Sequence, residues 1–222
     1  MSGKAPGRCC AGGSKGACSD AWPDPVEAAQ AANLEWANAR FGPESDLPGR
    51  ADEPQRPSML WFGCVDSRVP IERLAGLGIG DALVHRTIAN RVASDDPASS
   101  ATLEFGLGVL GIREVVVCGH DRCGGLAAAL GEPGAVPEAV ETWIEPLRAL
   151  IERHRETLDA IAEPDVRLRR LVELNVLDQV EAVRRSAVHR RLEQAGDAPR
   201  VHGWVYDIAT GRLRDAAESP SA

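Results

Sequence analysis

Two short apolar runs in this sequence each lead directly into side chains that can bind a metal ion. Met59–Phe62 leads into Cys64–Arg68, and Val115–Cys118 leads into Gly119–Cys123. The second run is continuous and β-branched, which is typical of a parallel strand that is buried on both faces. Two such runs favour a fold in which the ends of two buried strands lie together and their polar side chains form one metal-binding site.

The order of the apolar patterns predicts an α/β fold. Strands alternating with helices favour a mostly parallel central sheet flanked by helices. In such sheets ligands bind at the carboxyl ends of the strands, so we expect the Cys64 and His120 clusters on one edge. The expected strands are Ser58–Val65, Ala82–Val84, Glu114–Cys118 and His202–Asp207. The expected helices are Ile71–Leu77, Ser99–Leu110, Leu126–Leu130, Pro137–His154 and Asp165–Gln194.

Composition divides the chain into three parts. Residues 1–22 are rich in Gly, Ser, Cys and Lys without any period, which predicts a flexible tail that leaves Cys9, Cys10 and Cys18 without a role. Residues 23–57 are predicted to be an N-terminal helical arm and a proline-rich linker, because Asp24 is a good N-cap and Pro25 suits the first helical position. Residues 58–222 contain both clusters and are predicted to be the catalytic α/β domain.

Charge and hydropathy exclude several classes of partner. The net charge of −8 argues against nucleic acid or an anionic membrane as the main partner. No apolar stretch approaches the roughly 20 residues of a membrane span, and no apolar signal segment follows the N-terminus, so a cytoplasmic protein is expected. Six cysteines in a chain of 222 residues do not suggest a disulfide framework, which favours metal binding or catalysis for some of them.

Cys64, His120 and Cys123 are the candidate metal ligands. Two thiolates and an imidazole suit Zn²⁺, which prefers tetrahedral sulfur and nitrogen, and three protein ligands leave one position open, as in catalytic zinc sites. If the first strand stays extended, residues 64, 66 and 68 share one face. Asp66 is then either a fourth ligand or the neighbour of a bound water, and Arg68 is placed to pair with it.

A packing role is the alternative for the second cluster. His120 and Cys123 alone are a weak signal, because the loop also fits a strand-to-helix turn in which Cys123 packs in the first helical turn. Cys118, inside the apolar run, is expected to be a small buried hydrophobic residue and not a ligand. The arginines of the predicted helix, including Arg169 and Arg170, are expected to be solvated.

Five stretches together resemble the β-class carbonic anhydrases, and the resemblance extends from about residue 58 to residue 215. They are Cys64–Val69, His85–Asn90, Gly119–Gly125, Glu173–Val176 and His202–Tyr206. The resemblance implies reversible hydration of carbon dioxide to bicarbonate and a proton by a zinc-bound hydroxide. It also implies a homodimer that often pairs into a tetramer, with the N-terminal helix embracing the partner subunit.

The resemblance also assigns residue roles. It implies Zn²⁺ on Cys64, His120 and Cys123 as the cofactor, with Asp66 and Arg68 as the catalytic dyad. It implies two states of the site: Asp66 bound to zinc in a closed state, or held away by Arg68 in an open one.

Three further residues match a regulated subgroup of the family. Trp61, Arg86 and Tyr206 occupy the positions that bind a non-catalytic bicarbonate and favour the closed site there. Allosteric control by bicarbonate and pH is therefore expected. The alternative is that these residues pack at strand ends, with Arg86 in a structural ion pair.

Two other functions fit the same residues. A zinc hydroxide can attack carbonyl sulfide or carbon disulfide instead, and a closed site can belong to a non-catalytic metal-binding protein. The presence of both Asp66 and Arg68 argues against the latter, because a structural zinc does not need the arginine. The sequence ends at Ala222, where many relatives continue into a further helix, and this leaves open whether the assembly is a dimer or a tetramer.

Overall fold

The computed structural model describes residues 24–41, 53–93 and 95–218. The chain divides into two units, one ending at Pro54 and one that comprises residues 55–222. The predicted tail, with Cys9, Cys10 and Cys18, and most of the predicted linker lie outside the described residues.

The first unit contains one described helix, α1 (Pro25–Arg40). It begins as the sequence predicts, because the Asp24 carboxylate accepts hydrogen bonds from the backbone N–H groups of Val26 and Glu27 at 2.8 and 3.2 Å. None of the residues in α1 is buried. The rings of Trp36 and Phe41 contact each other edge-on, with their centroids 5.4 Å apart.

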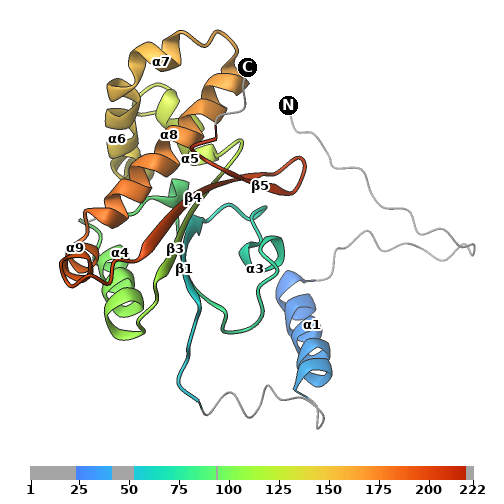
Figure 1. The fold of residues 1–222 in the computed structure, drawn as a ribbon. Coiled ribbons are helices and arrows are strands. Elements are labelled where there is room, and N and C mark those ends of the chain that lie inside the picture. The colour runs from blue at the N-terminus through green and yellow to red at the C-terminus, as the bar shows by residue number, and fades with distance from the viewer. Residues whose placement is uncertain (1–23, 42–52, 94, 219–222) are drawn as a thin grey trace, which may run out of the picture. The chain divides into compact units, whose positions relative to one another are not determined.

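The second unit is built on a five-stranded sheet in the order β2-β1-β3-β4-β5 (Figure 1). The four parallel strands are β1 (Met59–Cys64), β2 (Ala82–Thr87), β3 (Glu114–His120) and β4 (Arg200–Asp207). The predicted mostly parallel sheet flanked by helices is confirmed. The sequence did not predict the antiparallel edge strand β5 (Arg212–Asp215), which returns along β4 after a turn.

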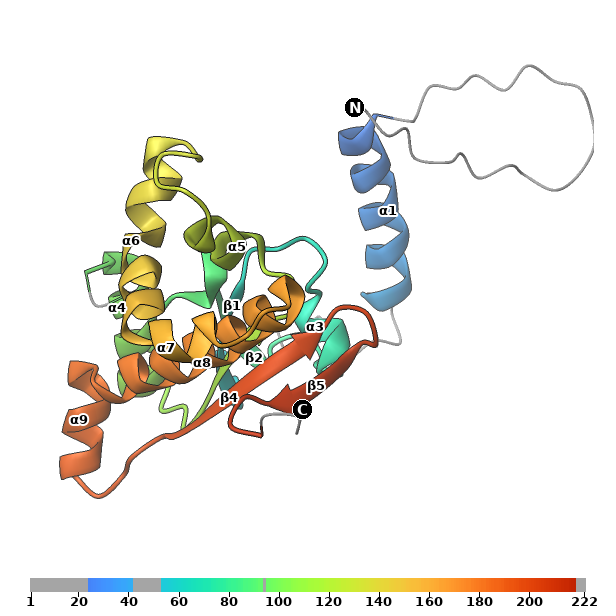
Figure 2. The ribbon, with the colours of Figure 1, turned by 90° about the horizontal axis from the view of Figure 1, so that it is seen from above.

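Most helices of this unit lie on one face of the sheet, and a short helix, α3 (Ile71–Leu74), packs on the other (Figures 1 and 2). The larger apolar cluster joins Phe62 and Val117 to the helices that follow β3, and the smaller one joins Trp61, Cys118 and Ile71. The α-helices of this unit are α3 (Ile71–Leu74), α4 (Pro97–Leu103), α5 (Gly124–Leu130), α6 (Glu138–Arg153), α7 (Arg155–Asp159), α8 (Pro164–Arg184) and α9 (Ala187–Gln194). In the parts of the chain that the structure describes, no helix is long and apolar enough to cross a bilayer.

Two of the predicted helices differ in the structure. The single helix expected over Asp165–Gln194 is broken, because Ser186 caps α9 by accepting a hydrogen bond from the backbone N–H of His189 at 3.3 Å. The helix expected from Ser99 begins earlier, at Pro97, and continues as a π-helix, η2 (Glu104–Val109). Between β2 and α4, the short 3₁₀ segment η1 (Ile88–Asn90) contains two residues with left-handed backbone, Ala89 and Asn90.

Candidate metal centre

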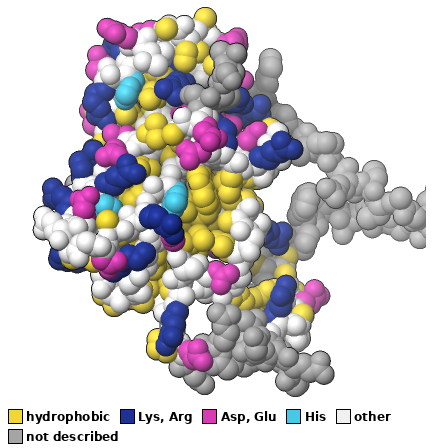
Figure 3. Space-filling model, viewed as in Figure 1, with side chains coloured by type: hydrophobic (Ala, Val, Ile, Leu, Met, Phe, Trp, Pro, Cys, Tyr) yellow, Lys and Arg dark blue, Asp and Glu magenta, His cyan; other side chains and the backbone are white. Residues whose placement is uncertain are grey.

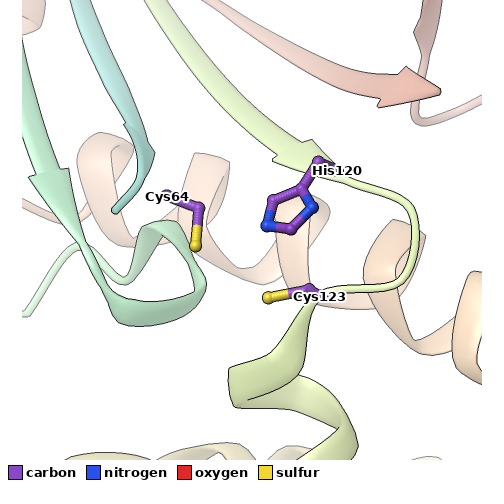
Figure 4. A group of neighbouring side chains, drawn as sticks. All are labelled: Cys64, His120 and Cys123. Carbon is purple, nitrogen blue, oxygen red and sulfur yellow. The ribbon is translucent and has the colours of Figure 1, made fainter. Parts of the chain in front are cut away.

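Neighbouring strand ends bring the three predicted metal ligands together. Cys64 is the last residue of β1 and His120 the last of β3, while Cys123 directly precedes α5. β1 and β3 are adjacent and parallel, so their carboxyl ends lie at the same edge. The ligand atoms of the three residues lie within 4.8 Å of one another, and all three residues are buried. Figure 4 shows both sulfurs pointing into a shared space beside the imidazole ring of His120.

The imidazole of His120 is oriented by its own loop. The Nδ1 atom lies 3.0 Å from the Asp121 carbonyl oxygen, which accepts its proton and leaves the lone pair on Nε2. Nε2 is buried and has no hydrogen-bond partner among the described residues. The free lone pair of Nε2 and the two cysteine sulfurs together are donors of the kind that bind a tetrahedral zinc ion. The residues present therefore fit zinc.

The Cys64 and Cys123 thiols lie close enough for each to shift the pKa of the other. The hydrogen bond that Cys123 donates is the main reason that the pKa of Cys64 falls to about 4, and it outweighs the opposing effect of burial. The same contact raises the pKa of Cys123, and burial raises it further. Burial acts to lower the pKa of His120, but the neighbouring Cys64 thiolate outweighs it and raises the pKa. The lowered pKa of Cys64 favours the thiolate, the form in which cysteine binds metal.

Asp66 borders this group through a turn and not through an extended strand. The strand ends at Cys64, and the backbone N–H of Val69 donates to the Asp66 carbonyl at 3.1 Å. The chain does not stay extended beyond Cys64, so the condition under which residues 64, 66 and 68 would share one strand face is not met. The turn instead folds Arg68 back onto Asp66, whose Oδ2 atom lies 3.9 Å from His120 Nε2.

Arg68 binds both oxygens of the Asp66 carboxylate with two nitrogens on one edge of its guanidinium group. Nε donates to Oδ1 at 2.9 Å and Nη2 donates to Oδ2 at 2.7 Å, while the backbone N–H of Arg68 adds a third bond at 2.9 Å. These bonds hold the pKa of Asp66 well below its usual range, although burial opposes them. Asp66 is therefore an ionised acceptor at every pH at which the protein is expected to work.

Arg86 is hydrogen-bonded to the backbone of this turn. Its Nε donates to the Cys64 carbonyl and its Nη2 to the Asp66 carbonyl, both at 2.8 Å. The structural ion pair that the sequence allowed for Arg86 does not occur among the described residues. Trp61 and Tyr206 belong to the same small apolar cluster, and the buried Nε1–H of Trp61 has no acceptor in the described part of the chain.

Cys118 is buried, as predicted, and is not part of the group. It lies in the apolar cluster on the opposite face of the sheet from Cys64 and Cys123. Burial raises its pKa to about 12, which leaves it a thiol.

The sequence did not predict a polar network that adjoins the metal centre. Asp121, Glu173 and Arg214 form buried ion pairs, and Arg170, expected to be solvated, pairs with Glu173 at 2.9 Å. The one available signal was Glu173 itself, an acidic residue within the buried apolar stripe of α8.

Sequence comparison relates the chain to carbonic anhydrases. The sequence model of the family described as carbonic anhydrase matches residues 59–213. The carbonic anhydrase of Emericella nidulans is 36% identical over 183 residues, which cover 82% of this chain and 79% of that protein. The carbonic anhydrase of Pseudomonas aeruginosa is 37% identical over 176 residues, covering 75% and 76% of the two chains.

Solved structures show the same similarity. A chain from the crystal structures of two tetrameric β-carbonic anhydrases of Sordaria macrospora superimposes with a TM-score of 0.80 at 32% identity. The match covers 89% of this chain and 98% of that one. The β-carbonic anhydrase CafA of Aspergillus fumigatus gives a TM-score of 0.79 at 40% identity, covering 88% and 93% of the two chains.

Proposed function

This chain belongs to the β-class carbonic anhydrases, zinc-dependent lyases, and we propose that it binds its zinc through Cys64, His120 and Cys123 to hydrate carbon dioxide. The observation that carries the proposal is the buried Nε2 of His120, which lacks a partner among the described residues and lies with two cysteine sulfurs. Zinc held there supplies the Lewis acidity that makes water a nucleophile near neutral pH.

Asp66 is proposed to accept a hydrogen bond from the attacking water and to orient it towards carbon dioxide. Support comes from its position, 3.9 Å from His120 Nε2, and from the two guanidinium bonds that keep it ionised. An ionised carboxylate can only accept, so it fixes which way the water's proton points. Arg68 keeps the carboxylate in this role by pairing with both of its oxygens.

The same aspartate is proposed to act as a switch. If the Asp66 carboxylate leaves Arg68 and binds the metal, it takes the position that the water needs, and the site closes. The Arg68 side chain is 52% exposed, so water can replace its bonds when the carboxylate departs. The paired arrangement of Asp66 and Arg68 corresponds to the open form.

Bicarbonate is proposed to control this switch through Trp61, Arg86 and Tyr206. Arg86 supplies the charge for an anion, while Trp61 and Tyr206 supply N–H and O–H donors. Support comes from the Trp61 Nε1–H, which is buried without an acceptor in the described part of the chain. Arg86 also donates to the Asp66 carbonyl at 2.8 Å, so an anion that draws the arginine away loosens the turn that carries the switch.

A homodimer, which can pair into a tetramer, is proposed as the assembly. On helix α1 the large apolar side chains of Val26, Leu34 and Trp36 are between 45% and 65% exposed. Apolar surface of this kind is typical of a site that another protein covers. The second unit also presents an area of hydrophobic side chains among charged ones (Figure 3). We propose that a second copy of the chain covers such surfaces. Light scattering on the full chain is expected to give at least a dimer, and Trp36→Ser is expected to raise its dissociation constant.

A reducing compartment such as the cytoplasm is proposed for this chemistry. Cys64, Cys118 and Cys123 take part in no disulfide bond among the described residues. Oxidation of the first and third would remove the ligands, so hydrogen peroxide is expected to abolish zinc binding.

Hydration kinetics with matched cysteine variants test the proposed activity. The wild-type protein is expected to bind one zinc ion per chain and to hydrate carbon dioxide in stopped-flow assays. Cys64→Ser is expected to lower turnover by at least about 100-fold and to lose most of the zinc. Cys118→Ala, which removes a buried thiol outside the group, serves as the control and is expected to retain both. Full zinc content and activity in Cys64→Ser would contradict the ligand assignment.

The pH profile tests the proposed regulation. Turnover of the wild-type protein is expected to rise steeply with pH, with bicarbonate inhibiting at the lower values. Trp61→Phe keeps the aromatic ring and removes the N–H donor, and it is expected to weaken inhibition by bicarbonate. A shallow one-proton profile that is the same in both proteins would contradict the regulatory site.

A further inference from the structure

A buried ion-pair network joins the loop after His120 to the last strand and to α8. Arg214, on β5, pairs through Nη1 with Glu173 Oε1 at 2.8 Å and through Nη2 with Asp121 Oδ1 at 3.3 Å. The Glu173 side chain is 3% exposed and that of Asp121 is 10% exposed. Arg214 therefore bridges two nearly buried carboxylates that come from different elements of the fold.

Two further arginines approach the same carboxylates. Arg170 pairs with Glu173 at 2.9 Å, and Arg169 lies 3.8 Å from Asp121. Arg214 differs from these two arginines in two ways: it lies on the last strand, and it pairs with both carboxylates. Since a buried carboxylate is strongly unfavourable without a partner, these arginines together fix where both side chains lie, and Arg214 is the one that links the two carboxylates.

Asp121 transmits this restraint to the metal centre through its main chain. Its carbonyl oxygen accepts the proton of His120 Nδ1 at 3.0 Å, and its N–H donates to the Tyr206 carbonyl at 3.0 Å. The group that sets the orientation and tautomer of the His120 ring thus belongs to the residue whose side chain Arg214 holds. Changing a group of this kind behind a ligating histidine typically costs about 10- to 100-fold in metal affinity or activity.

We propose that Arg214 is a positioning residue for the metal centre: by holding the Asp121 carboxylate, it fixes the carbonyl that orients His120 and so slows the loss of zinc. This inference rests on the proposed function, because it takes His120 as a zinc ligand. It adds a residue 93 positions after Asp121 in the sequence, on a strand that contributes none of the three proposed ligands. Arg214 acts through Asp121 and not by touching the metal or the reacting atoms.

The rate of zinc release tests the proposal without relying on activity. The zinc-loaded full chain is mixed with a chromogenic chelator, and release is followed for the wild type and for Arg214→Gln. Release is expected to be about 10- to 100-fold faster in Arg214→Gln. Arg212→Gln is the matched control, since Arg212 is an exposed arginine on the same strand, and its release rate is expected to equal that of the wild type. Equal rates in Arg214→Gln and the wild type would overturn the proposal.

A double variant shows whether the effect passes through Asp121. Asp121→Asn alone is expected to speed zinc release, and adding Arg214→Gln is expected to change the rate little further. Multiplication of the two effects would mean that Arg214 acts by another route, such as general loosening of the fold, and would overturn the proposal.

A conservative variant keeps the test decisive if Arg214→Gln fails to fold, as judged by circular dichroism. Arg214→Lys then replaces it. The substituted ammonium retains one charge but lacks the planar guanidinium that bridges both carboxylates. Faster release is therefore still expected, and release at the wild-type rate would overturn the proposal.

The ligand assignment and this inference fail in different ways. Retention of one zinc ion by Cys64→Ser would contradict the proposed function. Loss of zinc from Cys64→Ser together with wild-type release from Arg214→Gln would contradict only the role of Arg214.

Discussion

Two aspartates lie beside the candidate metal centre, and arginines hold them in different ways. Asp66 is paired with Arg68, two residues away in the same turn, and the Arg68 side chain is 52% exposed. Asp121 is paired with Arg214, 93 residues away, and the Arg214 side chain is 23% exposed and also binds the buried Glu173. One contact is local and faces water, while the other is distant in sequence and largely enclosed.

This difference separates a group that can move from one that has to stay. When Asp66 leaves Arg68, water solvates the half-exposed arginine, so this pair is expected to cost less to open than a fully buried one. When Asp121 leaves Arg214, a charge remains in a poorly solvated environment, and breaking a buried pair costs about 3–5 kcal/mol. Asp66 is therefore suited to switching and catalysis, and Asp121 to keeping the His120 ring in place.

The largest expected effect comes from neutralising the mobile aspartate. Asp66→Asn retains the size of the side chain but replaces a carboxylate by an amide that can also donate, so the attacking water loses its fixed acceptor. Turnover of carbon dioxide is expected to fall about 10²- to 10⁴-fold in stopped-flow assays, with the zinc content unchanged. Asp121→Asn is the matched variant and is expected to change zinc release more than turnover. Equal changes in turnover and in zinc release in Asp66→Asn and Asp121→Asn would contradict the distinction between a mobile and a fixed aspartate.

Removing the exposed arginine is expected to change the pH response of Asp66. In the wild type the Arg68 bonds hold the pKa of Asp66 below its usual range. Their contribution to stability is fully present above the unfolded pKa, about 3.9, and is lost as pH falls towards the lower folded pKa. In Arg68→Ala the pKa is expected to rise, which carbon-detected NMR of labelled aspartates can measure. An Asp66 resonance that titrates alike in both proteins would contradict the proposal that Arg68 keeps Asp66 ionised.

Two adjacent glycines test how tightly the Cys123 side of the centre is packed. A Cβ on Gly125 would lie 2.5 Å from Ile88 Cγ2, whereas one on Gly124 meets nothing within 4 Å. Gly125→Ala is expected to lower the free energy of unfolding by about 1–3 kcal/mol. Gly124→Ala is expected to change it by no more than about 0.5 kcal/mol. Equal effects in urea denaturation would mean that this side of the centre is not tightly packed.

The smallest effect is expected for an exposed ion pair outside both regions. Arg191 donates two hydrogen bonds to Glu104, from Nη1 to Oε1 and from Nη2 to Oε2, and both side chains are about half exposed. Arg191→Ala is expected to cost about 0.2–1 kcal/mol of unfolding free energy and to leave zinc release unchanged. A cost above about 2 kcal/mol would show that exposed pairs in this protein are too strong to serve as switches.

The parts of the site that the sequence predicts are formed by residues that lie close together in the chain. Cys64, Asp66 and Arg68 are close together in the chain, and the strand-end rule was enough to bring His120 next to Cys64. The strand containing His120 extends beyond its predicted end at Cys118, because His120 pairs with Tyr206 on β4. Pairing of this kind depends on a strand far away in the sequence, which no local pattern reveals.

The contacts that support the site were not predictable for the same reason. The pair formed by Arg214 and Asp121 exists only because β5 folds back along β4. Arg170 lies among other arginines on a helix, and nothing near it in sequence distinguishes it from the solvated ones. The break before α9 did have a local signal in Ser186, but the apolar periodicity continues across it and masked the cap.

X-ray absorption at the zinc edge tests the account most directly, because it reports the ligands themselves. The zinc-loaded wild-type protein is expected to show two sulfur atoms at about 2.3 Å and one imidazole nitrogen at about 2.0–2.1 Å, with a lighter atom completing four ligands. Cys64→Ser is expected to lose one sulfur. A spectrum without sulfur, or one that Cys64→Ser leaves unchanged, would contradict the assignment of Cys64, His120 and Cys123 as the zinc ligands.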